Sequence, residues 1–405
     1  EKIIRKCNFN SHFTPYTTRN TFITLLAEAN VNPKVTMELA GHSVIETTLT
    51  YYTKSSSIVL NNAILALQNN RIDDSIEMEE VAKHTLEMVQ LADRNNFHIA
   101  WAAEHHALEM TIAPNPFQIL TWWGAHTDKI RLGTGVVAAA YWHPIKLAGE
   151  AAFTDLITGG RLEFGIGSGA YQREFDRMQP GLKQSDAWRY MQEILPAVKE
   201  LWKGDYEHKG EFWNFPTSTS VPKPLQKPHP PIWVAARSPI TYDYAIKNDC
   251  NVMCWPFTRP FAEAELYKRL FEEALEKTKS TKRPTLALMR HTAVYQKESG
   301  RDIPTKAIQR VLGQFENLYK NLGDVSNGFP KQIPLESLTN RAEFDPEMLQ
   351  ENLMFGTPKT IIKKLRKYEQ LGVDEFIYYA SMGLGFKEQK DSLKLFCSEV
   401  MPAFQ

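Results

Sequence analysis

The stretch "IRLGTGVVAAAYWHPIKLAGEAAFTDLITGGRLEFGIGSG" (130–169) places two short apolar runs on either side of a helix-length segment. The runs, 130–138 and 162–169, are nearly continuous in apolar residues, which is typical of parallel strands covered on both faces. A strand, a crossover helix and a second parallel strand form the repeating unit of α/β folds. This stretch therefore predicts an α/β protein.

The same unit recurs along most of the chain. The apolar runs are 63–68, 98–103, 130–138, 162–169, 232–236, 251–255, 285–295 and 374–380. Helical patterns lie between them, as in 358–372, where Gly372 stands at the expected end of a helix. About eight such units predict a (β/α)8 TIM-type barrel with insertions. A doubly wound open sheet is the alternative that periodicity leaves open.

Two insertions, 207–231 and about 300–355, interrupt this repeat with several prolines. Long excursions in barrels of this kind commonly build the rim over the active-site mouth. We therefore expect both insertions at the mouth.

The composition is that of an ordinary globular protein, with 43% hydrophobic and 23% charged residues and a formal net charge of +0. Such a balance gives no general attraction to nucleic acid or to an anionic membrane. No run approaches the ~18 apolar residues of a membrane span, and the first residues lack the apolar core of a signal peptide. We expect a cytoplasmic protein without a membrane segment.

Four cysteines are scattered along the chain, at Cys7, Cys250, Cys254 and Cys397. Their spacing suggests neither a disulfide framework nor a zinc site. Cys250 and Cys254 are interpreted as buried thiols, and no metal is expected.

Candidate functional residues stand where predicted strands end, which is where barrel active sites are built. Glu104, His105 and His106 follow the run 98–103. Imidazole exchanges protons near neutral pH, so the three residues are candidates for acid–base catalysis. Hydrogen bonding without catalysis is the alternative. Joint metal binding by the two histidines is not expected, because adjacent strand residues point to opposite faces.

Two further strand ends could hold a ligand. The glycines of "GIGSG" (165–169) would let backbone approach a flat or phosphorylated ligand, or would merely ease strand–helix packing. Arg237, Ser238 and Thr241 stand at the start of a predicted helix, where free N–H groups and hydroxyls attract anions. An ordinary helix N-cap would use the same groups, so the sequence leaves both possibilities open.

Several blocks resemble the bacterial luciferase-like flavin monooxygenases. They include "AAEHHALEMTIAPNPF" (102–117), "KPLQKPHPPIWVAARSPIT" (223–241) and "GVDEFIYYASMG" (372–383), and the similarity runs from about residue 63 to the end of the chain. The resemblance implies a (β/α)8 barrel that binds reduced FMN, or a deazaflavin as in some relatives, and activates O2. It also implies a small organic substrate, a homodimer, and flavin reduced by a separate reductase or in place by NAD(P)H.

The resemblance also implies residue roles. His105 matches a histidine tied to the oxygen chemistry at the flavin, with Glu104 and His106 beside it. Ser238 and Thr241 match hydroxyls that bind the flavin phosphate.

The loop of Gly167, Ser168, Gly169 and Tyr171 matches one that lines the flavin, and Ala139 falls near the place of a cis peptide beside its ring. Luciferase has an arginine for the phosphate where this chain has Ser168, and either Arg237 or Arg173 is the expected substitute.

The first sixty residues predict a small all-α segment, separated from a barrel of residues 61–405; a helical extension of the barrel is the alternative. Residues of about 5–60 resemble the C-terminal part of phage-integrase tyrosine recombinases. Arg19 and His42 match catalytic residues of that family, and Tyr51 matches its DNA-attacking nucleophile. Tyr16 replaces a family histidine, and most of the DNA-binding groups are absent.

We interpret this segment as a relic or a fused reading frame and do not expect nucleic-acid binding. DNA recombination is the alternative function. At the junction, Ala63–Gln68 is either the end of a recombinase helix or the first barrel strand. The strand is favoured, because without it the neighbouring strands would expose their edges.

Overall fold

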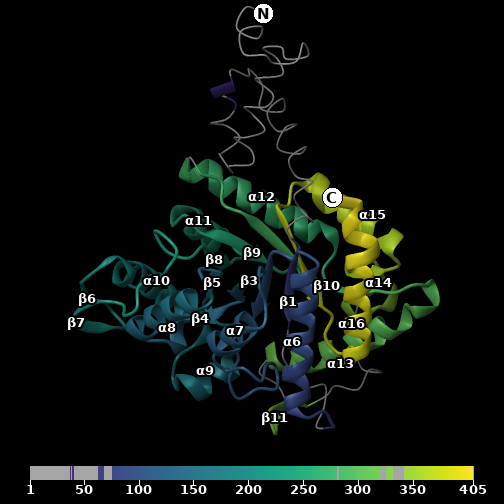
Figure 1. The fold of residues 1–405 in the computed structure, drawn as a ribbon, viewed down its shortest axis with the longest axis horizontal. Coiled ribbons are helices and arrows are strands. Elements are labelled where there is room, and N and C mark those ends of the chain that lie inside the picture. The colour runs from purple at the N-terminus through teal and green to yellow at the C-terminus, as the bar shows by residue number, and fades with distance from the viewer. Residues whose placement is uncertain are drawn as a thin grey trace, which may run out of the picture.

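The structure is a computed structural model, and it describes residues 37, 39, 40, 63–67, 75–280, 282–319, 325–331 and 342–404. The described chain forms a closed barrel of parallel strands with helices around it (Figure 1). The ring closes where β10 pairs with β9, through Leu286–Leu288 and Val252–Cys254. The predicted barrel is therefore confirmed, and the open sheet is excluded.

The barrel strands are β1 (Ile64–Leu67), β2 (Ile99–Ala102), β3 (Arg131–Thr134), β5 (Leu162–Gly167), β8 (Ile232–Ala235), β9 (Asn251–Cys254), β10 (Leu286–Val294) and β14 (Glu375–Ala380). Each lies within one of the apolar runs that predicted it. The run 63–68 supplies the first strand, because Ile64 pairs in register with Ile377 on one side and Ile99 on the other. Gln68 lies outside the described residues.

The surrounding helices are α6 (Met78–Arg94), α7 (Pro116–Ala125), α8 (Pro144–Ile157), α10 (Ala187–Lys203), α11 (Pro239–Lys247), α12 (Phe261–Thr278), α15 (Pro358–Leu371) and α16 (Phe386–Leu395). Between strands and helices lies the main hydrophobic core, with Trp123, Phe164 and Phe376 fully buried. As predicted, α15 ends at Gly372, whose φ of 77° suits a residue without Cβ.

The insertion at 207–231 does not build the mouth, so this expectation was wrong. It begins with an antiparallel hairpin, β6 (Tyr206–Lys209) and β7 (Asn214–Ser218). Phe212 stacks on Tyr190 of α10 with ring centroids 3.7 Å apart, and Phe215 lies 5.6 Å from His143 at the start of α8. The insertion joins the end of α10 to the start of β8, so it begins at the amino ends of the strands and covers the outside of two helices.

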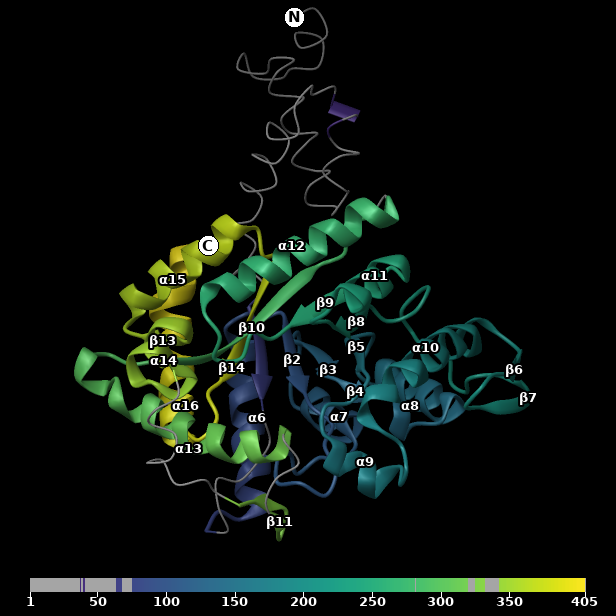
Figure 2. The ribbon, with the colours of Figure 1, turned by 180° about the vertical axis from the view of Figure 1, so that it is seen from behind.

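The second insertion does lie at the mouth. It follows the carboxyl end of β10 and contains α13 (Asp302–Tyr319), β11 (Val325–Ser326), β12 (Phe329–Pro330), α14 (Pro346–Asn352) and β13 (Met354–Gly356). The Gly328 carbonyl accepts a hydrogen bond from Glu109 N at 2.8 Å, which ties the β11–β12 turn to the loop after β2. In Figure 2, α13 and β11 lie below the barrel, on the side to which β1 points. The sequence did not predict β13, which pairs with β10 over three residues.

Two smaller observations concern the helices and the cysteines. No helix in the described ranges has the length and apolar character needed to cross a membrane. Cys250 and Cys254 are free, buried thiols, as predicted, and Cys397 is too.

Candidate active site

The mouth of the barrel collects the predicted site residues, because all eight strands run parallel and their carboxyl ends open on one face. His105 follows β2, Tyr171 follows β5 and Ser238 follows β8. Strands β2, β3, β5 and β8 are consecutive neighbours in the barrel, so these residues share one side of the mouth.

His105 is held by a carboxylate that the sequence did not single out. Its Nδ1 lies 3.2 Å from both carboxylate oxygens of Glu174, on the short helix α9 (Gln172–Met178). Glu174 also accepts from the backbone N of His106 at 2.6 Å. With a carboxylate at Nδ1, the neutral imidazole carries its proton there and Nε2 is left as an acceptor.

The environment of His105 leaves this acceptor available. The His105 side chain is 16% exposed, and within the described part of the chain its Nε2 forms no hydrogen bond. Tyr171 is buried, with its ring centroid 5.7 Å from that of His105. The loops after β2 and β5 therefore meet around a histidine with one ring nitrogen open to a ligand.

Glu104 uses its side chain for hydrogen bonds with the neighbouring loops. Its buried carboxylate accepts from Ala138 N at 2.7 Å and from Trp142 Nε1 at 2.9 Å, and it lies 2.7 Å from His106 Nε2. These contacts tie the end of β2 to the loop that begins α8. The polar atoms of Glu104 and His106 thus hold the site together, which fits the alternative of hydrogen bonding without catalysis.

The start of α11 carries the predicted hydroxyls. Thr241 Oγ1 accepts from the backbone N of Ser238 at 3.1 Å and of Arg237 at 3.2 Å. The Arg237 side chain is exposed, with its guanidinium 4.3 Å from the ring centroid of Phe257. Thr241 therefore forms a capping box with Ser238 at the start of α11, with the exposed Arg237 beside it.

Small residues line the mouth on the β3, β5 and β8 side. Ala235 is exposed although Val234 and Ala236, on either side of it, are buried. A Cβ added at Gly133 would lie 2.2 Å from the Trp101 ring, so that indole lies directly against β3. Trp101 meets Trp233 edge-on at 5.4 Å. The two indoles pack together inside the barrel, and Ala235 is exposed at the end of β8.

The loop after β5 needs its last glycine for a structural reason. Gly169 has a φ of 91°, and a Cβ there would lie 2.8 Å from Phe175. Gly167 is buried, whereas Ser168 is half-buried.

The expected position of the cis peptide was wrong. The cis bond joins Gly135 and Val136, between β3 and β4 (Val137–Ala138). Ala139 begins a 3-10 turn, η1 (Ala139–Tyr141), and its side chain is fully buried in the core between strands and helices. Gly135 and Val136 are half-buried.

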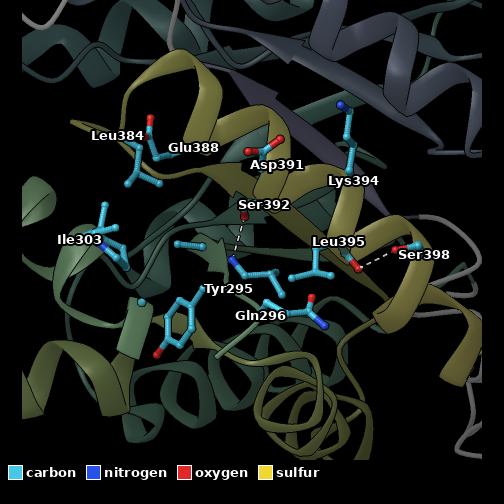
Figure 3. A pocket seen from close by; sticks show the side chains of 14 residues that line it. Tyr295, Gln296, Ile303, Leu384, Glu388, Asp391, Ser392, Lys394, Leu395 and Ser398 are labelled. Atoms are coloured by element: carbon cyan, nitrogen blue, oxygen red, sulfur yellow. Dashed lines mark hydrogen bonds between the residues drawn. The ribbon is translucent and has the colours of Figure 1, made fainter. Parts of the chain in front are cut away.

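A separate pocket of about 420 Å³ lies outside the barrel, between α16 and the start of α13 (Figure 3). It is lined by residues such as Tyr295, Ile303 and Asp391. Ser392 at its base already bonds Val294 N at 2.7 Å and the Tyr378 hydroxyl at 2.6 Å. None of the predicted site residues lines it. Among the described residues, no group of His, Cys, Asp or Glu side chains could hold a metal ion.

Comparison with known proteins identifies the family. The model of the family described as luciferase-like monooxygenase matches residues 63–375. The chain belongs to the luciferase-like monooxygenases. It is 41% identical over 340 residues to the oxygenase component of a flavin-dependent trigonelline monooxygenase from Acinetobacter baylyi, covering 84% of this chain and 94% of the relative.

Solved structures share the fold of this luciferase-like monooxygenase. Monooxygenase RslO1 from Streptomyces bottropensis is 22% identical, with a TM-score of 0.72 over 85% of this chain and 100% of that one. The oxygenating constituent of 3,6-diketocamphane monooxygenase from Pseudomonas putida, in complex with FMN, is 16% identical, with a TM-score of 0.68 over 84% of this chain and 98% of that one. At these identities the likeness concerns the fold alone.

The recombinase resemblance gains no support from these comparisons, because the matched family model begins at residue 63. Arg19, His42 and Tyr51 lie outside the described residues.

Proposed function

We propose that this chain is the oxygenase component of a two-component monooxygenase, which uses reduced FMN and O2 to oxygenate a small organic substrate. The observation that carries the proposal is the His105–Glu174 pair, which fixes an imidazole at the mouth and leaves Nε2 open. Membership of the family and the flavin-dependent relative at 41% identity support it.

The residues at the mouth fit a flavin. Exposed Ala235 and the two packed indoles of Trp101 and Trp233 would let a flat ring lie against this side of the mouth. The N-terminus of α11, with Ser238, Thr241 and Arg237, suits a phosphate, because hydroxyls and a positive charge at the positive end of a helix dipole attract an anion. Gly167 ends β5, and Ser168, Gly169 and Tyr171 lie between β5 and α9; all four would border the cofactor.

The residues near the proposed flavin ring would each have a role that their surroundings allow. His105 would accept or return a proton at Nε2, while Glu174 keeps the imidazole oriented. Buried Tyr171 and Trp101 would exclude water from the reaction. Reduced flavin, when bound, supplies the electron pair that lets one oxygen atom enter the substrate.

The source of reduced flavin follows from the relative's name, "oxygenase component". We infer that a separate flavin reductase supplies reduced FMN. Purified chain with FMN, NADH and substrate should form oxygenated product only after a flavin reductase is added. Product formed without a reductase would mean that NAD(P)H reduces the flavin in place. If the chain bound a deazaflavin but not FMN, the deazaflavin would be the cofactor. Trigonelline, named for the Acinetobacter baylyi relative, is the first substrate to test.

A homodimer is proposed from an apolar face on α8. Phe153, Leu156 and Ile157 are 53%, 43% and 46% exposed, and their helical spacing places them on one side. Exposed Val221 extends this face, because its carbonyl lies 3.7 Å from the Cβ position of Gly149 on α8. We define these four residues as the α8 face. Contiguous exposed apolar surface of this kind marks a contact between proteins.

Residues 61–405 are proposed as the catalytic unit, with residues 1–60 as a separate segment. DNA recombination through Arg19, His42 and Tyr51 stays a prediction of the sequence.

A further inference from the structure

The half of the mouth opposite the small residues is aromatic. His291 and Tyr379 lie side by side, paired in register on β10 and β14, with ring centroids 4.7 Å apart. Trp255, just after β9, lies 5.4 Å from His291 and 5.3 Å from Tyr379. Phe257 stacks on Trp255 at 4.1 Å. We call these four residues the aromatic wall.

Buried polar atoms at this wall lack partners. His291 Nδ1, Trp255 Nε1 and Ser381 Oγ form no hydrogen bond within the described part of the chain, although His291 is 1% and Ser381 0% exposed. Ser381 stands two positions beyond Tyr379, on the same face of the extended chain. Because buried polar groups almost always have a partner, three such atoms in one place indicate a group that arrives from outside.

The hydrogen-bonding capacity of these three atoms indicates which kind of chemical group would bind them. An indole N–H can only donate, while a hydroxyl and a neutral imidazole each have one proton to give. A cluster of donors suits a group with several acceptor oxygens, of which a carboxylate has the most.

The charged side chains near the aromatic wall are compatible with the binding of an anion. Arg290 does not fill the site, because its guanidinium bonds the Tyr368 hydroxyl at 2.9 Å and the Arg259 carbonyl at 2.7 Å. Arg237 remains exposed at the edge of the wall, over Phe257. Its positive charge therefore lies next to the wall.

We propose that the aromatic wall and Ser381 form the substrate-recognition site, and that it takes a planar aromatic or heteroaromatic carboxylate. The ring packs against Trp255 and Tyr379, and the carboxylate accepts hydrogen bonds from His291 and Ser381. The substrate then faces the proposed flavin side, formed by β3, β5 and β8. This inference rests on the proposed function and deepens it by naming the substrate class.

The test measures binding without turnover. FMN-loaded protein is titrated calorimetrically with benzoate, nicotinate and trigonelline, and with the matched carboxamides. The wild type should bind at least one carboxylate roughly tenfold or more tightly than its carboxamide, since hydrogen bonds to a charged group are stronger than those to a neutral one. Equal affinity for both members of every pair, or binding of no carboxylate, would overturn the proposed class.

Variants locate the site. His291→Phe and Ser381→Ala should each weaken carboxylate binding roughly 10- to 100-fold and leave FMN affinity unchanged. The control is Trp123→Phe, because Trp123 Nε1 is also buried without a partner but belongs to the core outside the barrel; it should change neither affinity. If both site variants bind the carboxylate like the wild type, ordered water fills the cluster and the assignment is wrong. Failure of the wild type to bind FMN would instead refute the proposed function.

Discussion

The imidazole Nδ1 of His105 lies 3.2 Å from both carboxylate oxygens of Glu174, a residue 69 positions further along the chain. The pair joins the loop after β2 to the helix that follows β5. It fixes the ring orientation and the tautomer together, so in the proposed function Nε2 is the nitrogen that would exchange a proton. Other residues at the mouth can bind, but this pair provides a directed proton acceptor.

Removing the imidazole should therefore reduce oxygenation without reducing flavin binding. We expect His105→Gln to lower kcat by roughly 10²- to 10⁴-fold, the usual contribution of a positioned acid–base group. Glu174→Gln should lower kcat less and raise the hydrogen peroxide released per NADH, because the ring loses its orientation. The control is Asp176→Asn, an exposed neighbour on α9. Full kcat and full coupling in both site variants would rule out this role.

Glu104 should matter for stability more than for chemistry. Glu104→Ala leaves Trp142 Nε1 and Ala138 N buried without an acceptor, and each lost acceptor costs about 1–3 kcal/mol. We expect urea titration to give a free energy of unfolding lower by about 2–4 kcal/mol. A variant as stable as the wild type but without activity would instead make Glu104 a catalytic residue.

The phosphate site at α11 is tested by comparing FMN with riboflavin, which lacks the phosphate. Ser238→Ala and Arg237→Ala should each lower FMN affinity about tenfold, since a bond to a charged group is lost. Riboflavin affinity should change little in either variant. Fluorescence quenching measures both constants, and an equal loss for both flavins would place the phosphate elsewhere.

His291 should make the protein less stable in acid. Burial, together with nearby Arg290, lowers the pKa of His291 to about 3. The unfolded chain takes up a proton on this residue below about pH 6.5, but the folded chain does not. The contribution of neutral, buried His291 to the free energy of unfolding is fully present above pH 6.5. It is lost as the pH falls toward 3, by at most about 1.4 kcal/mol per pH unit.

We therefore expect the unfolding free energy of His291→Phe to fall less steeply than that of the wild type between pH 6.5 and 4. Denaturant titrations at several pH values measure these slopes. Parallel slopes in the two proteins would show that His291 takes up a proton in the folded state.

The α8 face should hold a dimer together. We expect Leu156→Glu to convert a dimer to a monomer, because burying an unpaired charge in an apolar contact is unfavourable. Analytical ultracentrifugation measures the mass, with exposed Met178→Glu on α9 as the control. A monomeric wild type, or a dimer that survives the Leu156 substitution, would contradict the proposal.

The barrel could be predicted from the sequence because its strands are buried on both faces and so appear as continuous apolar runs. β13 was not predicted, because a strand of three residues is too short to show a pattern. The insertion at 207–231 was misplaced although its position between a helix and the next strand indicates the amino ends of the strands. The sequence supplied no distance between Glu174 and His105, so their pairing needed coordinates.

The unpaired atoms at the aromatic wall could not be predicted from the sequence, for a different reason. Trp255 and His291 lie in two separate apolar runs and Ser381 directly follows a third, and the sequence gives no sign that they share a site. Only the register of β10 with β14 and the turn after β9 bring them together.

The central claim is that this barrel uses reduced flavin to place one atom of O2 in an organic substrate. Its most direct test is mass spectrometry of the product formed under ¹⁸O2 with FMN, a flavin reductase, NADH and a planar aromatic carboxylate such as trigonelline. The account predicts product that carries a single ¹⁸O atom and is formed only with both reductase and enzyme present. Reduced FMN that binds at the mouth while product contains oxygen from water alone would contradict it.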